Sequence, residues 1–343
     1  MSASAVDRAT VGTRRPGLLT RLFVSEYLVL YLCAAYFLAI LPVVPQMASF
    51  AVLQNVLADM LPLLAVAIGQ TFVLIIAGID LSVGSIIAMV SVAGASVMTG
   101  DGGYLGGSAL AVPGALVVML GLGAALGALN GLCVTRLSMP PFIVTLAGMM
   151  FWSGAAIWFT TFHTTTSSIA NLPRGFVVIG QGAALGVANS FWVVLALGLA
   201  AHVILARTVL GRRLYAIGRN RRTALVSGVP VGRAVVLAFA ISGLCAAVAS
   251  ILYTGRLETG TPILGDRILL DVIGAVVIGG TSLFGGKGKI VWTVFGVLFL
   301  VLLDTSLKML GMSLFFVLAI KGAVILLAAV IDALRTRMLA RGL

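Results

Sequence analysis

The sequence has few charged residues and few cysteines, and both shortages restrict what the protein can be. Only 9% of its 343 residues are charged, whereas 61% are hydrophobic. Soluble domains carry about 25% charged and about 45–50% apolar residues. This chain is therefore too apolar for a cytosolic enzyme, a secreted scaffold or a nucleic-acid-binding domain. Its cysteines, Cys33, Cys133 and Cys245, lie far apart in apolar runs and form neither a disulfide framework nor a metal site.

Catalytic and nucleotide-binding patterns are also missing. The two histidines, His163 and His202, lie far apart and belong to no H-E-x-x-H motif. Gly286-Lys287 lacks the spacing and the following Ser or Thr of a phosphate-binding loop. No polar stretch is long enough for a nucleotide-binding domain. We therefore expect no catalytic residue, no metal site and no cofactor held by this chain.

Long apolar runs make up most of the sequence. A membrane-spanning helix needs about 20 mostly apolar residues, and Pro62 within one of the runs is expected to kink its helix. The predicted fold is an all-α, polytopic transmembrane helix bundle of about ten spans. The predicted spans are 26–44, 52–77, 83–99, 109–135, 141–161, 190–206, 233–255, 268–284, 290–307 and 313–332.

The net charge of +12, from 22 Lys and Arg against 10 Asp and Glu, is unevenly distributed. When the N-terminus is placed in the cytoplasm and the spans alternate, most basic residues fall on the cytoplasmic side, as the positive-inside rule requires. We therefore expect both termini to be cytoplasmic. The expected organisation is a basic, disordered tail over 1–21, a transmembrane domain over 22–334 and a second basic tail over 335–343.

The predicted cytoplasmic loop at about 207–232 is rich in arginine and contains no acidic residue. Membrane topology alone explains the arginines. It does not explain the interleaved apolar residues Leu214, Ile217, Ala224 and Leu225. These favour short amphipathic helices at the membrane surface that contact a protein partner or lipid headgroups. The longest external segment, 163–189, is instead expected to be a connector.

Two glycine-interrupted turns, 77–84 and 279–288, follow the second and eighth predicted spans. Paired segments of this kind in two halves of a chain point to a transport pathway. The alternative is that both are tight turns that need positive φ angles. Aligned with each other, the turns share four residues: Ile76 with Ile278, Gly78 with Gly280, Leu81 with Leu283, and Gly84 with Gly286.

Charged residues within or near the ends of the predicted spans are Asp59, Asp271, Asp304, Lys308 and Lys321. Asp304 and Lys308 are four positions apart and can neutralise each other on one helix face. Lys321 lies inside the last span. It is expected to face the bundle interior and to pair with a carboxylate such as Asp304 or with backbone carbonyls. The absence of a central carboxylate relay argues against a proton-driven mechanism.

Several stretches resemble the integral membrane permeases of ribose-type ATP-binding-cassette (ABC) sugar importers, and the resemblance extends over about 50–332. Departures from the family pattern at Arg222-Thr223, Val229-Pro230 and Asp304 leave the family assignment intact and concern partner specificity. The stretches are GQTFVLIIAGIDLSVGSI (69–86), LGRRLYAIGRNRRTALVSGVPV (210–231) and LLDVIGAVVIGGTSLFGGKGKIVWTVFG (269–296), with GALNG (127–131) and PFIVTLAGM (141–149).

The resemblance implies the permease subunit of an importer in a bacterial cytoplasmic membrane, carrying a monosaccharide or sugar-like solute. Implied partners are a cytoplasmic ABC ATPase, which holds ATP and Mg, an extracytoplasmic solute-binding protein, and a second identical or related permease. The residues matching the ATPase-coupling segment are Gly211, Arg212, Tyr215, Gly218, Asn220, Ala224, Ser227 and Gly228. The expected pathway or gate residues are Gly78, Asp80, Ser82, Gly84, Gly280, Thr281 and Ser282.

Other functions remain open at this point. The first is an ion-coupled secondary carrier that uses Asp304, Lys308 or Lys321 and needs no ATPase. A second is an ABC permease for a nucleoside or an amino acid, because a shared fold does not fix the solute. A membrane-embedded enzyme would need a catalytic cluster near one leaflet, which the scattered His and Cys residues do not supply.

Overall fold

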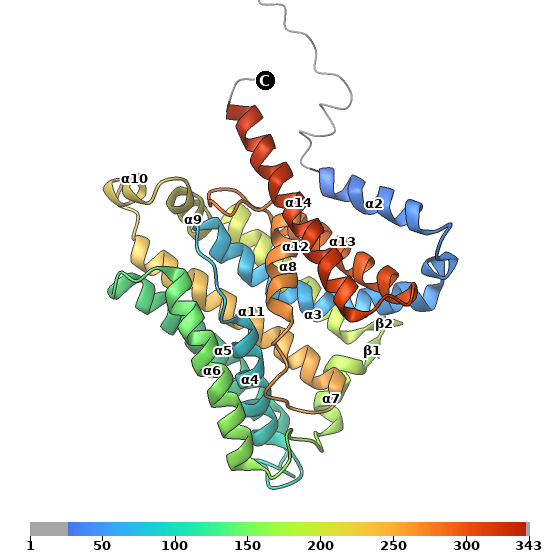
Figure 1. Ribbon diagram of the computed structural model, residues 1–343. Helices are drawn as coiled ribbons and strands as arrows, with labels where there is room; N and C mark the ends of the chain where they lie inside the picture. Colours follow the sequence, from blue (N-terminus) through green and yellow to red (C-terminus); the bar gives the residue numbers. More distant parts are fainter. Residues whose placement is uncertain (1–26, 341–343) are drawn as a thin grey trace, which may run out of the picture.

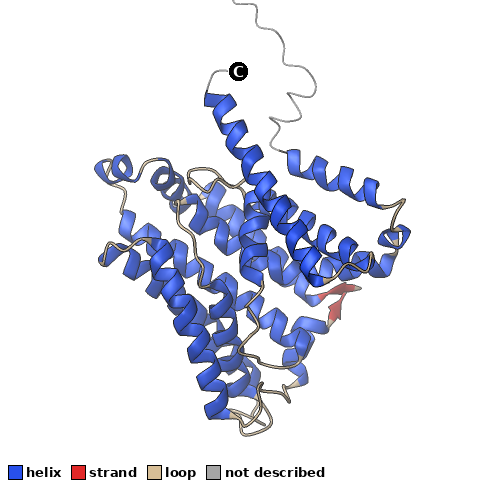
Figure 2. Cartoon of the chain, viewed as in Figure 1, coloured by secondary structure: helices blue, strands red, loops and turns tan. Residues whose placement is uncertain are grey.

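The computed structural model describes residues 27–340, and within them long apolar helices form the body of the molecule (Figures 1 and 2). This confirms the prediction of an all-α, multi-pass bundle. Among the described residues, seven helices are long and apolar enough to cross a membrane: α3 (Phe50–Ile75), α5 (Ala111–Arg136), α6 (Pro141–His163), α8 (Asn189–Arg207), α11 (Val231–Leu257), α13 (Ile290–Met309) and α14 (Leu314–Ala340). Three shorter apolar helices are α2 (Leu28–Ile40), α4 (Val83–Met98) and α12 (Ile268–Ile278).

Short elements connect these helices. A 3-10 turn, η1 (Pro45–Ala48), precedes α3, and two short helices, α9 (Val209–Arg219) and α10 (Arg221–Val226), lie between α8 and α11. The segment expected to be a plain connector instead contains α7 (Arg174–Gln181) and a hairpin of β1 (Ala183–Ala184) and β2 (Val187–Ala188). Helix α7 packs against α11. Hydropathy misses these elements because they are too short to span a membrane.

The predicted end of the span over 268–284 is wrong. Helix α12 ends at Ile278 rather than near 284, because Gly280 takes a φ of 96° that no helix allows. Helix α14 continues to Ala340, so the described part of the predicted tail, 335–340, is helical. Arginine and alanine favour helix, and no glycine interrupts that stretch. The predicted tail at 1–21 and residues 341–343 lie outside the described residues, while α3 continues as one helix through Pro62.

The core of the bundle is the contact between α5 and α11, where glycines let the two backbones touch. Gly123, Gly127 and Gly131 follow one another at intervals of four on one face of α5. A Cβ atom on Gly127 would overlap the carbonyl oxygen of Phe239, and one on Gly243 would overlap the carbonyl oxygen of Gly123. Small residues at such spacing are how membrane helices approach closely without a hydrophobic driving force.

Two of the chain segments that cross the bundle are only partly helical. Residues 77–82 are non-helical before α4, and 258–267 are non-helical before α12; in Figure 1 both segments run into the bundle. They meet where each helix begins, since a Cβ on Gly84 would lie 2.5 Å from the carbonyl oxygen of Gly265. Irregular backbone at this depth is tolerated only where protein surrounds it.

The same order of elements therefore occurs twice: a long helix, a non-helical segment, a short helix and two long helices, as α3–α6 and as α11–α14. Contacts correspond as well, because α11 packs on α4 and α5 while α3 packs on α12 and α13. The halves run in opposite directions, since Gly69 of α3 lies beside Cys245 while Gly78, just beyond the end of α3, lies beside Phe239, earlier in α11. The fold thus pairs 77–82 with 258–267, not with the turn 279–288 as the aligned glycines predicted.

The glycine contact between α5 and α11 yields the first prediction. Gly127→Leu should destabilise the protein by roughly 1–3 kcal/mol or more, because the added side chain has no space beside Phe239. Thermal unfolding of the purified protein in detergent measures this. Gly121→Leu on the same helix is the matched control, because a Cβ at Gly121 meets nothing within 4 Å. Equal melting temperatures for the two variants would contradict the proposed packing.

Candidate coupling and translocation site

Helices α9 and α10 are the short amphipathic pieces that the arginine-rich segment predicts. The Thr208 hydroxyl accepts a hydrogen bond from the Gly211 amide at 3.3 Å and begins α9, and the Asn220 side chain accepts one from the Thr223 amide at 2.9 Å and begins α10. Such caps satisfy amides that a helix start leaves unpaired. Both helices lie at the upper left of Figure 1.

The inward face of α9 is apolar and its outward face is basic. Leu214 and Ile217 are buried against the bundle, as expected, whereas the arginines of α9 and α10 are exposed. In α10 the inward position belongs to Ala224. The side chain of Leu225, the neighbouring apolar residue, is instead 63% exposed. A helix of six residues has room for only one such inward position.

Helix α9 packs on the end of α3 and on the turn between α12 and α13. The Gly286 amide donates to the Ile75 carbonyl at 2.8 Å, and a Cβ on Gly218 would overlap that same carbonyl. The Tyr215 hydroxyl donates to the Gly288 carbonyl at 2.7 Å. Partial burial raises the pKa of Tyr215, so the hydroxyl keeps the proton that it donates at neutral pH. Three segments distant in sequence are thereby joined at one point.

The turn from 279 to 289 has a shape that requires glycine. Gly285 and Gly286 have φ angles of 82° and 72°, which side-chain-bearing residues rarely adopt. Within the turn, the Ser282 amide donates to the Lys287 carbonyl at 3.0 Å, and the Gly285 amide donates to the Ser282 carbonyl at 3.1 Å. The backbone of Gly285 also lies against Ala77, so the turn closes directly over the end of α3.

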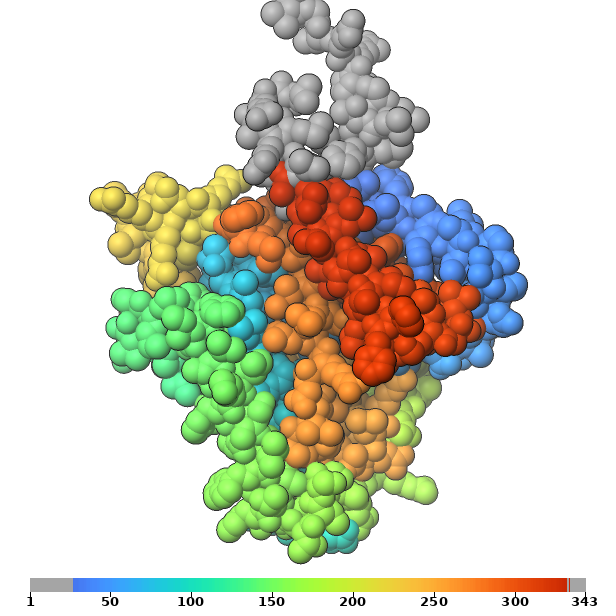
Figure 3. Space-filling view, viewed as in Figure 1, coloured from blue at the N-terminus to red at the C-terminus, as the bar shows by residue number. Residues whose placement is uncertain are grey.

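The outward side of α9 and α10 forms a groove of about 510 Å³. In the space-filling view these helices project from the upper left of the body (Figure 3). Of the eight predicted coupling residues, Gly211 and Gly218 pack inward and Gly228 ends α10. The other five, Arg212, Tyr215, Asn220, Ala224 and Ser227, all line the groove.

The segment between α3 and α4 is held inside the bundle by a buried polar network centred on Asp80, which is fully buried. One carboxylate oxygen accepts from the Ser82 amide at 3.0 Å and the Ser82 hydroxyl at 2.6 Å, and the other accepts from the Ser242 hydroxyl at 2.9 Å. The Gln70 side chain, oriented to satisfy both groups, pairs with the backbone N–H and C=O of Asp80 at 3.2 Å. A fully satisfied buried network fixes the backbone that it binds.

The network extends to two further helices. The Asn130 amide donates to the Ser82 hydroxyl at 2.8 Å, and the Thr145 hydroxyl donates to the Ile79 carbonyl at 3.1 Å. The non-helical segment is therefore attached to α3, α5, α6 and α11. The sequence did not single out Gln70, Asn130, Thr145 or Ser242 as site residues. Their only signal is a hydrogen-bonding side chain within an apolar run, which does not say that they meet at Asp80.

The predicted gate residues occupy two places rather than one. Gly78, Asp80, Ser82 and Gly84 lie in or directly after the non-helical segment inside the bundle. The remaining gate residues, Gly280, Thr281 and Ser282, lie in the turn beside α9. The hydrogen bond between Gly286 and Ile75 connects the two places.

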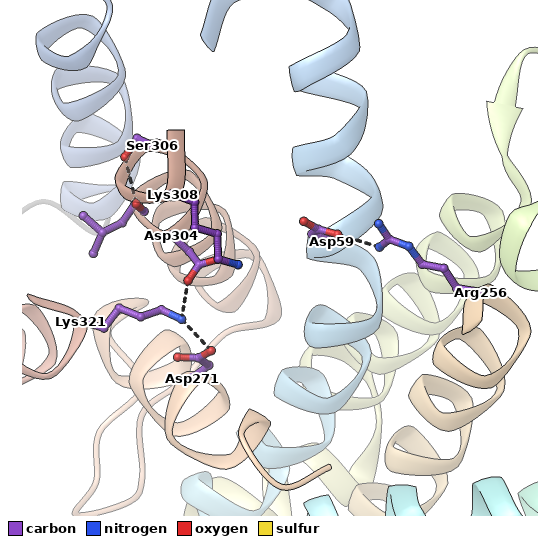
Figure 4. Close-up of polar contacts among 8 residues, drawn as sticks. Asp59, Arg256, Asp271, Asp304, Ser306, Lys308 and Lys321 are labelled. Atoms are coloured by element: carbon purple, nitrogen blue, oxygen red, sulfur yellow. Dashed lines mark hydrogen bonds and ion pairs between the residues drawn. The ribbon is translucent and has the colours of Figure 1, made fainter. Parts of the chain in front are cut away.

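The intramembrane charges form a separate group (Figure 4). The Lys321 ammonium contacts Asp304 and Asp271, each at 2.9 Å. This confirms the expected pairing with Asp304 and adds Asp271, a partner that sequence spacing does not indicate. Asp304 also pairs with Lys308 one helical turn away, as predicted. A second ion pair joins Asp59 on α3 to another helix.

The Asp80 network yields a second prediction. Asp80→Leu should destabilise the protein by about 2–4 kcal/mol, because the Ser82 amide and the Ser242 hydroxyl lose their acceptor in a buried site. Asp80→Asn keeps one carbonyl acceptor and should cost less. Thermal unfolding in detergent gives both values, with the exposed Asp266→Leu as control. An Asp80→Leu variant as stable as the control would show that the network does not hold the segment.

Comparison with known proteins places the chain among transport permeases. The model of a family described as "Branched-chain amino acid transport system / permease component" matches residues 52–329. The ribose import permease proteins of Bacillus subtilis (strain 168) and Escherichia coli (strain K12) are 40% and 37% identical to this chain over 269 and 266 residues. Each match covers 78% of this chain and 80% of the relative.

A xylose transport system permease protein of Escherichia coli (strain K12) is 33% identical over 328 residues, covering 79% of this chain and 82% of the relative. No solved structure matches the chain. The family match spans most of the helical bundle, from the first turn of α3 to the apolar part of α14. The chain therefore belongs to the family of ABC importer permeases that its sequence motifs indicated, and it is a transport subunit rather than an enzyme.

Proposed function

We propose that this permease carries a monosaccharide, such as ribose or xylose, across a bacterial cytoplasmic membrane. The names of its relatives support this solute class. The observation that carries the mechanism is the docking of α9 on the end of α3 and on the turn after α12. The energy for transport comes from a separate ABC ATPase that binds ATP and Mg. This chain contributes the translocation path and the surface that contacts the ATPase.

The basic groove between α9 and α10 receives the ATPase. Arg212 and Arg219 stand exposed on its walls, and Tyr215 reaches from the groove to the Gly288 carbonyl behind it. A displacement of α9 by the ATPase therefore acts on the turn 279–289 and on the end of α3. The end of α3 leads directly into 77–82, and the turn is connected through α12 to 258–267; these non-helical segments are the parts of the bundle proposed to change packing.

The proposed topology has ten spans and two cytoplasmic ends. The three shorter apolar helices complete the seven long ones, with 77–82 and 258–267 supplying the missing length of two of them. Gly131, near the end of α5, lies beside Val236, near the start of α11, so Arg136 and Arg233 belong to the same end of the bundle as α9. Positive charge gathered at one end favours that end as cytoplasmic.

Two further partners follow from this orientation. The opposite end, where 99–110 and 164–173 connect the helices, faces an extracytoplasmic solute-binding protein. A second permease, identical or related, packs against the apolar faces that the bundle leaves uncovered. Helices α6 and α14 have only 17% and 11% of their membrane-length windows buried within the chain. Lipid covers the apolar surface of these helices that the second permease leaves uncovered.

An amino acid is the second candidate solute, because the description of the matching family names branched-chain amino acids. An ion-coupled carrier is less well supported, because Lys321 and Lys308 are both neutralised by carboxylates. Uptake of labelled ribose and xylose by vesicles containing the permease, its ATPase and its binding protein tests the proposal, with leucine as competitor. ATP-dependent sugar uptake that leucine does not inhibit is expected. Sugar uptake driven by an ion gradient without the ATPase would refute it.

Gly218→Ala gives a sharper test of coupling. The added methyl group should push α9 off the Ile75 carbonyl, so that ATP-driven uptake falls by at least an order of magnitude, equivalent to about 1.4 kcal/mol or more. Membrane insertion should stay near that of the parent, because α9 lies outside the membrane spans, although displacement of α9 costs some thermal stability. Gly232→Ala at the start of α11 is the matched control, because its nearest neighbour would be 3.9 Å away. Unchanged uptake by Gly218→Ala would disprove the role of α9.

A further inference from the structure

A charged cavity of about 240 Å³ lies at the end of the bundle opposite α9, between α3, α11, α12, α13 and α14. Figure 4 shows the two groups of ion pairs that face each other across it. On one side Lys321 is held by Asp271 and Asp304, and on the other Arg256 contacts Asp59 at 2.7 Å. Tyr253 of α11 also lines the cavity.

Three of these charges lie well inside the apolar helices, whereas Arg256, Asp271 and Lys308 lie in terminal turns. By the 1.5 Å rise per residue, Lys321 is about 10 Å from the start of α14, Asp304 about 8 Å from the end of α13, and Asp59 about 14 Å from the start of α3. Ionisable side chains at such depth are rare in membrane proteins. They are found where they face one another or a water-filled cavity, and they mark the routes of substrates or ions.

The charges of the cluster balance. Asp59, Asp271 and Asp304 stand against three cations, Arg256, Lys308 and Lys321. A neutral cluster offers no net attraction to an anion or a cation. Among the described residues there is also no group of His, Cys, Asp and Glu side chains arranged to hold a metal ion. The chemistry of the cavity therefore favours an uncharged ligand.

The cluster still has capacity for hydrogen bonds. The ion pairs use one carboxylate oxygen each of Asp59 and Asp271 and leave the other for a ligand. Hydroxyl groups suit this site because each one both donates to a carboxylate and accepts from an ammonium group. The ring of Tyr253 adds an apolar face. At about 30 Å³ per water molecule, the cavity holds roughly eight waters, or one small polyhydroxyl molecule.

The cavity is also physically linked to α9. Helix α12 has Asp271 in its first turn, beside the cavity, and its other end leads into the turn that α9 contacts. With 11 residues it is about 16 Å long and moves as a rigid rod. Any displacement of the turn by α9 therefore shifts Asp271 relative to Lys321 and Asp304, which belong to other helices.

We propose that this cavity is a subsite of the permease that binds one neutral polyhydroxyl molecule through Asp59, Tyr253 and the ion-paired side chains of Lys321, Asp271 and Asp304. The proposal rests on the proposed function, within which the ligand is the monosaccharide in transit. The partner-driven movement of α12 changes the distance between Asp271 and the remaining charges. This change in distance alters the affinity of the subsite for the sugar when the permease switches between its outward-facing and inward-facing states.

The test is saturation-transfer NMR on the purified full-length permease in lipid nanodiscs, with ribose and xylose as separate probes and leucine as the negative probe. We expect saturation transfer to the sugars and none to leucine. Asp59→Asn and Tyr253→Leu leave the Lys321 ion pairs in place and should weaken sugar binding about tenfold. Asp101→Asn is the control and should bind like the parent, because Asp101 is an exposed residue at the same end of the helix bundle as the cavity.

Two outcomes would overturn the subsite: no saturation transfer to either sugar, or equal binding by the parent and by both Asp59→Asn and Tyr253→Leu. Thermal unfolding of the same samples identifies variants that have lost their fold, and a fold-intact variant with weakened binding supports the site. The uptake assay distinguishes this result from a failure of the proposed function. ATP-driven sugar uptake without NMR-detected binding removes the subsite and leaves the function standing.

Discussion

The hydrogen bond from the Gly286 amide to the Ile75 carbonyl is the contact on which the remaining arrangement depends. It joins the last residue of α3 to the turn after α12, and Gly218 of α9 fits over it because it has no side chain. A helix end has carbonyl groups without partners within the helix, and here one of them is used to assemble three segments. Helices α9, α3 and α12 are thus connected through this one contact.

The second constraint is that backbone inside a membrane must be fully hydrogen-bonded. Two crossings that are only partly helical would violate this rule if lipid touched them. Around 77–82 the requirement is met by side chains: those of Asp80, Gln70 and Thr145 bind free backbone groups of the segment. The network is therefore what makes an irregular segment possible at this depth, and irregular segments give the fold its capacity to change shape.

Sequence alone predicted the long helices well, because a run of 20 apolar residues has few alternatives in a membrane. It also identified α9 from the apolar residues between its arginines. It did not predict the bonds of Asn130 and Ser242 in the Asp80 network or the contact of Lys321 with Asp271, because each of these pairs is separated by 48 or more positions and no local pattern relates them. The internal repeat was misaligned for a similar reason, since glycines mark turns of many kinds. Its partner segment in the fold, 258–267, corresponds to 77–82 by its place between a long and a short helix rather than by its residues.

The glycine seam between α5 and α11 also determines which parts of the molecule can move. Gly123, Gly127 and Gly243 bring two backbones together with no side chain between them to rotate or repack. Such a joint has one fitted position, so α5 and α11 form a stationary frame. Helices α12 and α13 also meet at a glycine, Gly296, whereas α14 is joined to them by larger side chains and by the ion pairs of Lys321, which can exchange partners. The helix best able to shift against this frame is thus α14, which carries Lys321.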